Sequence, residues 1–205
     1  MLLKVCGMRD KENIRNLASV RPDFMGTIFY EKSKRFIHPH DIDFPEEFVR
    51  ANIQWVGVFV NELLENVISI GSDLGLDYIQ LHGDEDLSYV QGLRQTGFKI
   101  VKSFPVDSDY DFEVTRAFES YCSYFLFDKK TPMYGGSGHS FDWSLLDNYK
   151  GETPFLLSGG ISEESVESIL RLSHDQLIGV DINSRFEKEP GLKNIDLIKK
   201  FKEKL

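Results

Sequence analysis

Eight short apolar runs alternate along this chain with longer stretches of helical periodicity, and this alternation restricts the fold more than any other feature. The runs cover residues 2–6, 24–30, 55–60, 78–81, 99–103, 124–128, 155–157 and 177–182. Strands that alternate with crossover helices predict a parallel sheet covered by helices. Eight such units in 205 residues favour a closed sheet over an open one, which would expose two edges. We therefore expect an α/β fold, a single (β/α)8 or TIM barrel that spans residues 1–205 as one domain.

The segments between the runs carry signals for helix starts and buried helix faces. Asn61 is predicted to cap a helix that continues to Ile70, and Ser162, followed by two glutamates, is predicted to cap another. The last helix has an apolar stripe formed by Ile195, Ile198 and Phe201, and we assign its lysines to a solvated face. The stretch 105–121 is acidic and has the weakest helical periodicity.

Charge and cysteine content restrict the partners and the compartment. A net charge of −9 argues against nucleic-acid binding, which needs a basic face, and against anionic membranes. No apolar run approaches the length of about 18 residues that a membrane span requires. The two cysteines provide no disulfide framework, which favours a reducing cytoplasm. An anionic small molecule must then be held locally, by backbone N–H groups, helix N-termini and a few cations.

Polar side chains cluster where the predicted strands end. They include Lys4, Cys6, Gln80, His82, Asp128 and Asp181. Because side chains alternate along a strand, Cys6 shares the inward face with Lys4. The same spacing places Gln80 and His82 together. In barrels of this kind the active site lies at the carboxyl ends of the strands, so this clustering favours a site over a purely structural core.

Three glycine-containing or polar loops follow the later strands. They are Ser158–Gly160 after the seventh strand, Asn183, Ser184 and Arg185 after the eighth, and the loop 134–138, which contains Gly135 and Gly136. The first two are neighbours in a closed barrel, where such loops commonly bind phosphate. A simple turn is the alternative for the Ser-Gly-Gly stretch. The third loop is either a lid over substrate or a surface linker.

Two residues are candidates for acid–base chemistry. Cys6 ends the first strand, and a thiolate stabilised by nearby positive charge can remove a proton from carbon. A buried, inert cysteine is the alternative. Asp128 ends a strongly apolar run, and burial favours the protonated carboxyl that a general acid needs, whereas Lys129 and Lys130 favour the carboxylate. A structural cap is the alternative for Asp128.

Basic and imidazole side chains add candidate binding groups. Arg35 could form a bidentate pair with a substrate carboxylate, or it is simply solvated. His82 could hydrogen-bond the substrate, or it is structural. No metal is expected, because His38 and His40 form a pair without a third ligand nearby and the cysteines lack zinc-like spacing.

Several segments, in order and over nearly the whole chain, together resemble the phosphoribosylanthranilate isomerase family. They are Lys4-Val5-Cys6-Gly7-Met8-Arg9, Lys32-Ser33-Lys34-Arg35, Val56-Gly57-Val58-Phe59-Val60-Asn61, Gln80-Leu81-His82-Gly83, Asp128-Lys129-Lys130-Thr131-Pro132 with Tyr134-Gly135-Gly136-Ser137-Gly138 and Phe141-Asp142-Trp143, Leu157-Ser158-Gly159-Gly160-Ile161, and Pro190-Gly191. The Thr-Pro, Gly-Gly-Ser-Gly and Phe-Asp-Trp elements are highly specific in combination.

This resemblance implies an Amadori rearrangement of N-(5-phosphoribosyl)anthranilate without metal or cofactor. It implies that Cys6 is the general base, Asp128 the general acid and Arg35 the group that holds the anthranilate carboxylate. The phosphate is expected at Ser158, Gly159, Gly160, Asn183, Ser184 and Arg185. The remaining contacts with substrate are expected from Gln80, His82, Gly135, Gly136 and Asp181.

One departure and two rival functions stay open. The family pattern after the eighth strand has a glycine where this chain has Arg185, so Arg185 either pairs with the phosphate or points to solvent. The first rival is a related barrel isomerase of the histidine pathway, which uses paired aspartates, one of them on the first strand where this chain has Cys6. The second rival is a non-catalytic barrel that binds phosphorylated ligands. Whether the protein is a monomer or a homodimer is also open.

Overall fold

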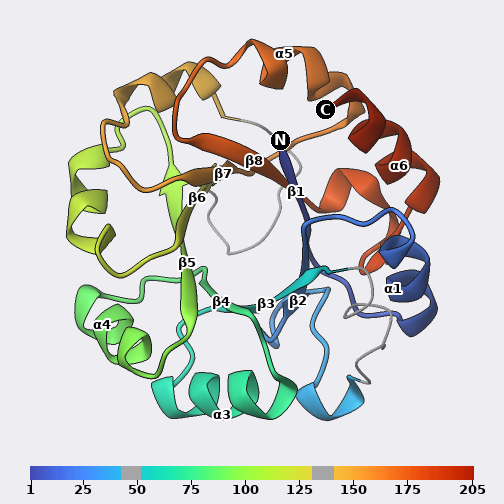
Figure 1. Cartoon of the computed structure of the whole chain (residues 1–205), viewed down its shortest axis with the longest axis horizontal. Helices are drawn as coiled ribbons and strands as arrows, with labels where there is room; N and C mark the ends of the chain where they lie inside the picture. The colour runs from blue at the N-terminus through green and yellow to red at the C-terminus, as the bar shows by residue number, and fades with distance from the viewer. Residues whose placement is uncertain (43–51, 131–140) are drawn as a thin grey trace.

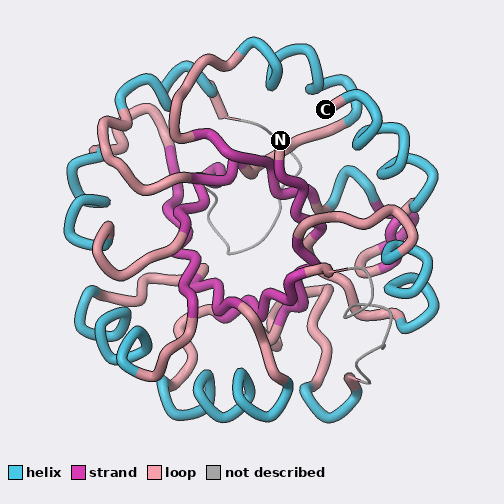
Figure 2. Tube along the Cα trace, in the orientation of Figure 1, coloured by secondary structure: helices cyan, strands magenta, loops and turns pink. Residues whose placement is uncertain are grey.

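The computed structural model describes residues 1–42, 52–130 and 141–205, and its centre is a closed barrel of eight parallel strands. Each strand pairs with the next in sequence, and β8 closes the ring by pairing with β1 (Figures 1 and 2). The strands are β1 (Leu2–Val5), β2 (Phe24–Ile28), β3 (Gln54–Phe59), β4 (Tyr78–Leu81), β5 (Lys99–Val106), β6 (Tyr124–Lys129), β7 (Phe155–Leu157) and β8 (Leu177–Ile182). The barrel predicted from the alternation of apolar runs is confirmed.

The strands follow the apolar runs closely, with the largest difference at β5. This strand continues through Pro105 to Val106, whereas the sequence predicted its end at Ser103. It pairs with β4 as far as Lys102 and with β6 as far as Val106. Beyond Lys102 one edge of β5 therefore has no strand partner, and a proline, which has no N–H to donate, is tolerated at such an edge.

Helices surround the ring of strands and cover its outer face (Figures 1 and 2). The α-helices are α1 (Lys11–Ala18), α3 (Leu64–Leu74), α4 (Leu87–Gln95), α5 (Val166–Arg171) and α6 (Ile195–Lys204). The 3-10 helices are η1 (Pro39–Asp41), η2 (Phe112–Phe118), η3 (Trp143–Asn148), η4 (Glu163–Ser165) and η5 (Ser184–Phe186). The weakly periodic stretch after β5 thus forms a 3-10 helix. Two short antiparallel strands, β9 (Glu187–Glu189) and β10 (Leu192–Lys193), follow η5.

The predicted helix starts are partly right. Ser162 directly precedes η4, which leads into α5, and its N–H donates to Ser165 Oγ at 3.0 Å. The prediction for Asn61 is wrong, because α3 begins at Leu64 with Leu63 as its cap. Asn61 has a left-handed backbone, with φ of 51°, and its side chain accepts a hydrogen bond from the next βα loop instead. Among the described helices, none is long and apolar enough to cross a membrane.

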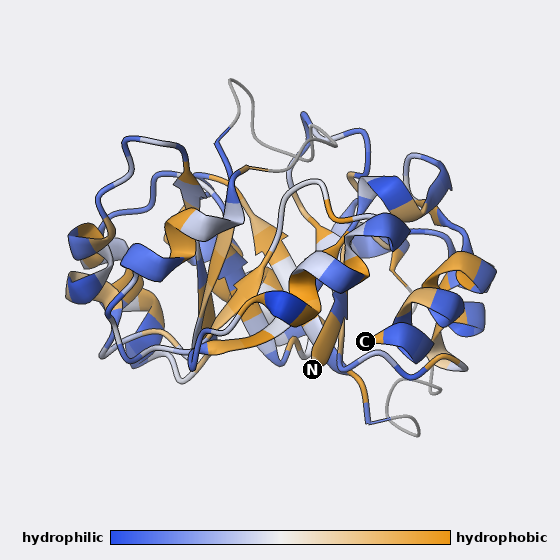
Figure 3. Cartoon of the chain, turned by 90° about the horizontal axis from the view of Figure 1, so that it is seen from above, coloured by the Kyte–Doolittle hydropathy of each residue, from blue (hydrophilic) through white to orange (hydrophobic). Residues whose placement is uncertain are grey.

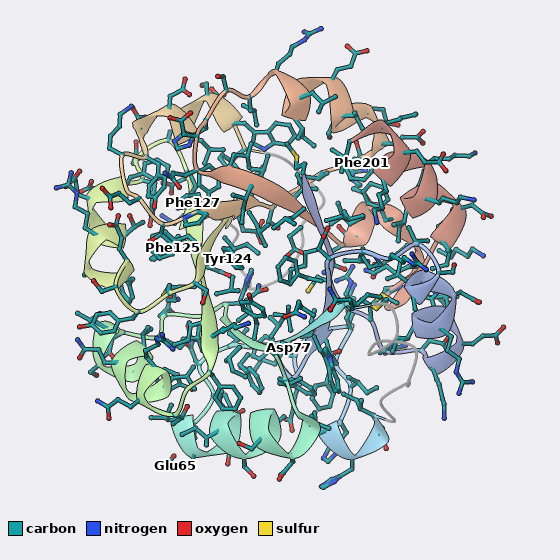
Figure 4. All side chains as sticks on the ribbon, in the orientation of Figure 1. Glu65, Asp77, Tyr124, Phe125, Phe127 and Phe201 are labelled. Carbon is teal, nitrogen blue, oxygen red and sulfur yellow. The ribbon has the colours of Figure 1, made fainter. Side chains whose placement is uncertain are left out.

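Alternation along the strands divides the apolar side chains into two clusters. On β6, Phe125 and Phe127 belong to the large cluster between strands and helices, while Leu126 belongs to a smaller one inside the barrel. Figure 4 shows Tyr124 directed toward the barrel interior, where its ring stacks on Tyr78 with centroids 5.7 Å apart. The strands are largely apolar and the outer helix faces hydrophilic (Figure 3).

The interior of the barrel changes from apolar to polar along the strand direction. Every second residue of a strand faces the same way, so Leu126 on β6 is followed on the inner face by Asp128. On β4, Tyr78 is followed by Gln80 and then by His82. Aromatic rings therefore fill the amino-terminal end of the barrel, and polar groups collect at its carboxyl-terminal end, where the site lies.

Candidate active site

A pocket opens at the carboxyl-terminal end of the barrel and brings together most of the predicted site residues. Its lining includes Cys6, Gln80, His82, Asp128, Ser158, Gly159, Gly160, Asp181, Asn183 and Ser184. Apolar side chains from β2 and β3, Ile28 and Val58 among them, complete the wall. A thiol from the first strand and a carboxyl from the sixth thus face one cavity, although 122 positions separate them in the sequence.

One wall is lined by Cys6 and Asp181, with the buried Lys4 paired to Asp181, and we name these three residues the thiol side. Lys4 Nζ donates to Asp181 Oδ2 at 2.9 Å, and the Lys4 side chain is completely buried. Burial raises the pKa of the Cys6 thiol, while the neighbouring Lys4 ammonium acts to lower it. Burial alone would lower the pKa of Lys4, but Asp181 and Cys6 raise it, which keeps the ammonium charged.

Another wall is lined by Gln80, His82 and Asp128, with Ser103 in contact with His82, and we name these four residues the carboxyl side. Asp128 Oδ1 accepts a hydrogen bond from the backbone N–H of Lys129 at 2.7 Å, and Asp128 Oδ2 lies 3.4 Å from His82 Nε2. Each of these two side chains is 18% exposed, so the carboxyl remains accessible from the pocket.

The neighbours of His82 determine which of its ring nitrogens carries the proton in the neutral form. Gln80 Nε2 lies 3.0 Å from His82 Nδ1, and Ser103 Oγ lies 2.8 Å from the same atom. An amide nitrogen can only donate, so Nδ1 accepts and the proton lies on Nε2. His82 therefore presents an N–H to Asp128. Ser103, which the sequence analysis did not single out, takes part in this arrangement from β5.

Two acceptor oxygens in the pocket have no partner. Gln80 Oε1 and Asp181 Oδ1 are both buried and receive no hydrogen bond from any described residue. An unpaired buried acceptor is costly, and such atoms are rare unless a ligand or solvent completes them. Both residues line the pocket, so their oxygens are suited to accept hydrogen bonds from hydroxyl or N–H groups of a bound molecule.

The loops after β7 and β8 lie at the same mouth. Gly159 and Gly160 have φ of 89° and 68°, a backbone conformation that favours glycine. A Cβ on Gly159 would lie 2.8 Å from Asp128 Oδ1, so this glycine also makes room for the carboxyl. Asn183 and Ser184 line the pocket, but Arg185 does not and its side chain is exposed.

Arg35 lies at the rim, where it is paired with Glu187. Arg35 Nε and Nη2 donate to the two Glu187 oxygens at 2.8 and 2.7 Å. Lys193 Nζ donates to Glu187 at 2.7 Å and to Asn183 Oδ1 at 2.6 Å. Burial lowers the pKa of Lys193 to about 8, although Glu187 acts to raise it. Arg35 is not among the residues that line the pocket, and its second edge, Nη1 with Nη2, is the part of the guanidinium that a further carboxylate can use.

Several of these groups were missed from the sequence. Glu187 and Lys193 gave no recognisable signal, because they lie in a short polar segment after the last strand. Lys4 was placed beside Cys6 from the sequence, but its pairing with Asp181 was not. Gly135 and Gly136, predicted to contact substrate, lie outside the described residues. Among the described residues, no three His, Cys, Asp or Glu side chains are grouped as a metal site requires.

Fold and pocket together define a (β/α)8-barrel enzyme whose site lies at the carboxyl ends of its strands. The sequence model of one family, described as N-(5'phosphoribosyl)anthranilate (PRA) isomerase, matches residues 3–204. An N-(5'-phosphoribosyl)anthranilate isomerase from Parabacteroides distasonis is 47% identical over 203 residues, which cover 98% of this chain and 91% of that one. The chain belongs to the N-(5'-phosphoribosyl)anthranilate isomerase family, as its motifs predicted, and it is an isomerase.

Solved structures agree with this assignment. The crystal structure of phosphoribosyl anthranilate isomerase from Thermotoga maritima matches with a TM-score of 0.84 at 33% identity, covering 100% of this chain and 98% of that one. A phosphoribosyl anthranilate isomerase in complex with reduced 1-(o-carboxyphenylamino)-1-deoxyribulose 5-phosphate matches with a TM-score of 0.79 at 29% identity, covering 98% and 96% of the two chains.

Proposed function

We propose that this chain catalyses the Amadori rearrangement of N-(5'-phosphoribosyl)anthranilate to 1-(o-carboxyphenylamino)-1-deoxyribulose 5-phosphate in tryptophan biosynthesis, with Cys6 as general base and Asp128 as general acid. The observation that carries the assignment of roles is that both side chains line one pocket at the carboxyl ends of the strands. Family membership supports the choice of substrate.

The reaction begins with two catalysed proton transfers, and a tautomerisation completes it. Asp128 gives its proton to the furanose ring oxygen, the bond from C1 to that oxygen breaks, and the nitrogen lone pair forms a C1=N iminium. The Cys6 thiolate then removes the proton from C2, and the released electron pair forms the C1=C2 bond of an enolamine. Proton return to C1 and loss of the C2 hydroxyl proton give the ketone. Atoms and electrons balance, so no oxidant or reductant is required.

The remaining pocket groups are assigned by the chemistry they can offer. The unpaired Gln80 Oε1 and Asp181 Oδ1 accept hydrogen bonds from substrate hydroxyls, and the loops Ser158–Gly160 and 183–184 hold the phosphate through backbone N–H groups and short polar side chains. Arg35 holds the anthranilate carboxylate through its second guanidinium edge while Glu187 keeps the first.

Turnover by purified variants tests this assignment. Cys6→Ser and Asp128→Asn are each expected to lower kcat by about 100-fold or more, the usual contribution of general acid–base catalysis. Cys122→Ser is the matched control for loss of a thiol and keeps the wild-type rate. Near-wild-type rates in both site variants would exclude the mechanism.

The rival functions are separated by substrate. Incubation with the histidine-pathway aminoimidazole substrate tests the related isomerase activity, which the thiol at position 6 disfavours because that chemistry uses paired aspartates. Turnover of the anthranilate derivative excludes a purely ligand-binding barrel. We further propose a cytoplasmic protein, monomeric or homodimeric, and light scattering of the purified chain distinguishes these two states.

A further inference from the structure

Lys4 is a completely buried lysine in the barrel interior, and the proposed chemistry gives it no step. An ammonium group removed from water requires a partner of opposite charge. Asp181 provides it at 2.9 Å, from the position directly opposite on the neighbouring strand, because β1 and β8 pair in the register Lys4 with Asp181. The ion pair therefore depends on closure of the barrel.

The ammonium of Lys4 also lies beside the thiol of Cys6, over a glycine of β2. A Cβ built on Gly26 would lie 2.9 Å from Cys6 Sγ and 3.2 Å from Lys4 Nζ. Both atoms therefore converge on one point of β2. Because Gly26 has no side chain, Lys4 Nζ and Cys6 Sγ can both occupy this space. A side chain at position 26 would clash with the thiol.

Charges of both signs face the thiol. Burial raises the pKa of Cys6, and Asp181 of β8 raises it too. Lys4 of β1 lowers it, and Lys193 of β10 lowers it with a smaller effect than Lys4. Across the pocket stand Asp128 and His82, and Arg35 lies at the rim. Of the charged groups, Lys4 has the largest influence on the thiol, and it favours the thiolate.

We propose that Lys4 is a positioning residue that stabilises the thiolate of Cys6 beside the bound substrate, and that Asp181 holds the ammonium in place. The inference rests on the proposed role of Cys6 as general base. A thiolate formed in a buried pocket needs a neighbouring cation, as reactive cysteines generally do. Asp181 thus has two functions: one oxygen fixes Lys4, and the other faces substrate hydroxyls.

The ionisation of Cys6 in the free protein tests this directly, without substrate. The thiolate is followed by its ultraviolet absorbance and by its rate of alkylation with iodoacetamide over a range of pH, in a Cys122→Ser background. Lys4→Met is expected to move the midpoint of thiol ionisation to higher pH by about one unit or more, the usual effect of an opposite charge at close range. At neutral pH, alkylation is then about tenfold slower.

Removing the carboxylate has the opposite effect, because Asp181 disfavours the thiolate. Asp181→Asn is expected to lower the midpoint. The double variant Lys4→Met/Asp181→Asn is expected to stay above wild type, since the influence of Lys4 on Cys6 exceeds that of Asp181. Opposite shifts from the two members of one ion pair cannot arise from general damage to the fold.

Lys102→Met is the matched control. Lys102 is likewise a buried lysine on a barrel strand, with Nζ 3.1 Å from Glu85 Oε2, but its other contacts are to backbone oxygens of Gly83 and Ser103. Its loss should leave the Cys6 midpoint unchanged.

An unchanged midpoint in Lys4→Met, or an equal shift in Lys102→Met, overturns the proposal. If Lys4→Met does not fold, a midpoint in Asp181→Asn at or above wild type overturns it. An inactive wild-type protein would refute the proposed function and leave the thiol titration to be judged separately.

Discussion

The two sides of the pocket hold their reactive groups by different means. On the thiol side, Cys6 lies beside a buried ion pair, with the Lys4 side chain 0% exposed and the Asp181 side chain 6% exposed. On the carboxyl side, Asp128 is contacted by a backbone N–H and by the imidazole N–H of His82. A buried ion pair supports the thiol, whereas a backbone N–H and an imidazole contact the carboxyl.

This difference matches the task assigned to each group. A buried thiol must lose its proton to become a base, and burial opposes that loss, so a cation is needed close by. A general acid must still carry its proton when substrate arrives. The Lys129 N–H and the His82 imidazole hold the Asp128 side chain in place and stabilise the carboxylate that remains after the proton has left. The comparison predicts that the thiol side is sensitive to loss of charge and the carboxyl side to loss of position.

The largest expected effect is on stability, at the thiol side. Lys4→Met leaves the carboxylate of Asp181 buried without a partner, which should lower the free energy of unfolding by about 3–5 kcal/mol. Ser103→Ala on the carboxyl side removes neutral hydrogen bonds and should cost about 1 kcal/mol. Urea unfolding of both variants measures the contrast. The double variant Lys4→Met/Asp181→Asn should recover most of the loss, and equal costs for the two single variants would remove the distinction between the sides.

A large effect on turnover is expected from Gly159→Ala, at the carboxyl side. The added Cβ would lie 2.8 Å from both Asp128 Oδ1 and the backbone nitrogen of Lys129, so the carboxyl must move. A displacement of about 1 Å at a reacting group lowers kcat by about 10- to 100-fold. Gly75→Ala is the control, because Gly75 also has positive φ, 65°, but has open space around it. Both variants should lose about 1–2 kcal/mol of stability through backbone strain, and a similar loss of turnover in both would show that strain alone is responsible.

The fold and the location of Cys6 and Asp128 in one pocket could be predicted from the sequence. The contacts that support these two residues could not. Periodicity predicts the strand order and where each strand ends. This is enough to place Cys6 and Asp128 at the same end of the barrel. The pairing of Lys4 with Asp181 depends on the register between the first and last strands, which periodicity does not determine. The prediction for Asn61 was wrong because asparagine is a common helix cap, whereas here its side chain accepts a hydrogen bond from the Asp84 N–H in the loop after β4.

A smaller effect is expected from His82→Asn. The variant loses the imidazole Nε2 that lies 3.4 Å from Asp128 Oδ2, a long polar contact between partly exposed groups. A net contribution of about 0.5–1.5 kcal/mol corresponds to a decrease in kcat of about two- to tenfold. KM should change less than kcat, since the imidazole acts through Asp128. Nitrogen chemical shifts of the wild-type imidazole provide an independent check: a proton on Nδ1 in place of Nε2 would contradict the assigned arrangement.

The smallest effect is expected from Arg185→Ala, because Arg185 belongs to neither the thiol side nor the carboxyl side of the pocket. Its side chain is exposed and does not line the pocket, so its charge acts on a bound phosphate through solvent. An exposed charge interaction contributes well under 1 kcal/mol, and KM should rise about twofold at low salt. Because added salt screens such an interaction, the difference from wild type should disappear as ionic strength increases. A rise in KM of tenfold or more that persists in high salt would instead show direct pairing of Arg185 with the phosphate. Arg185 would then bind the phosphate at the position where the family pattern has a glycine.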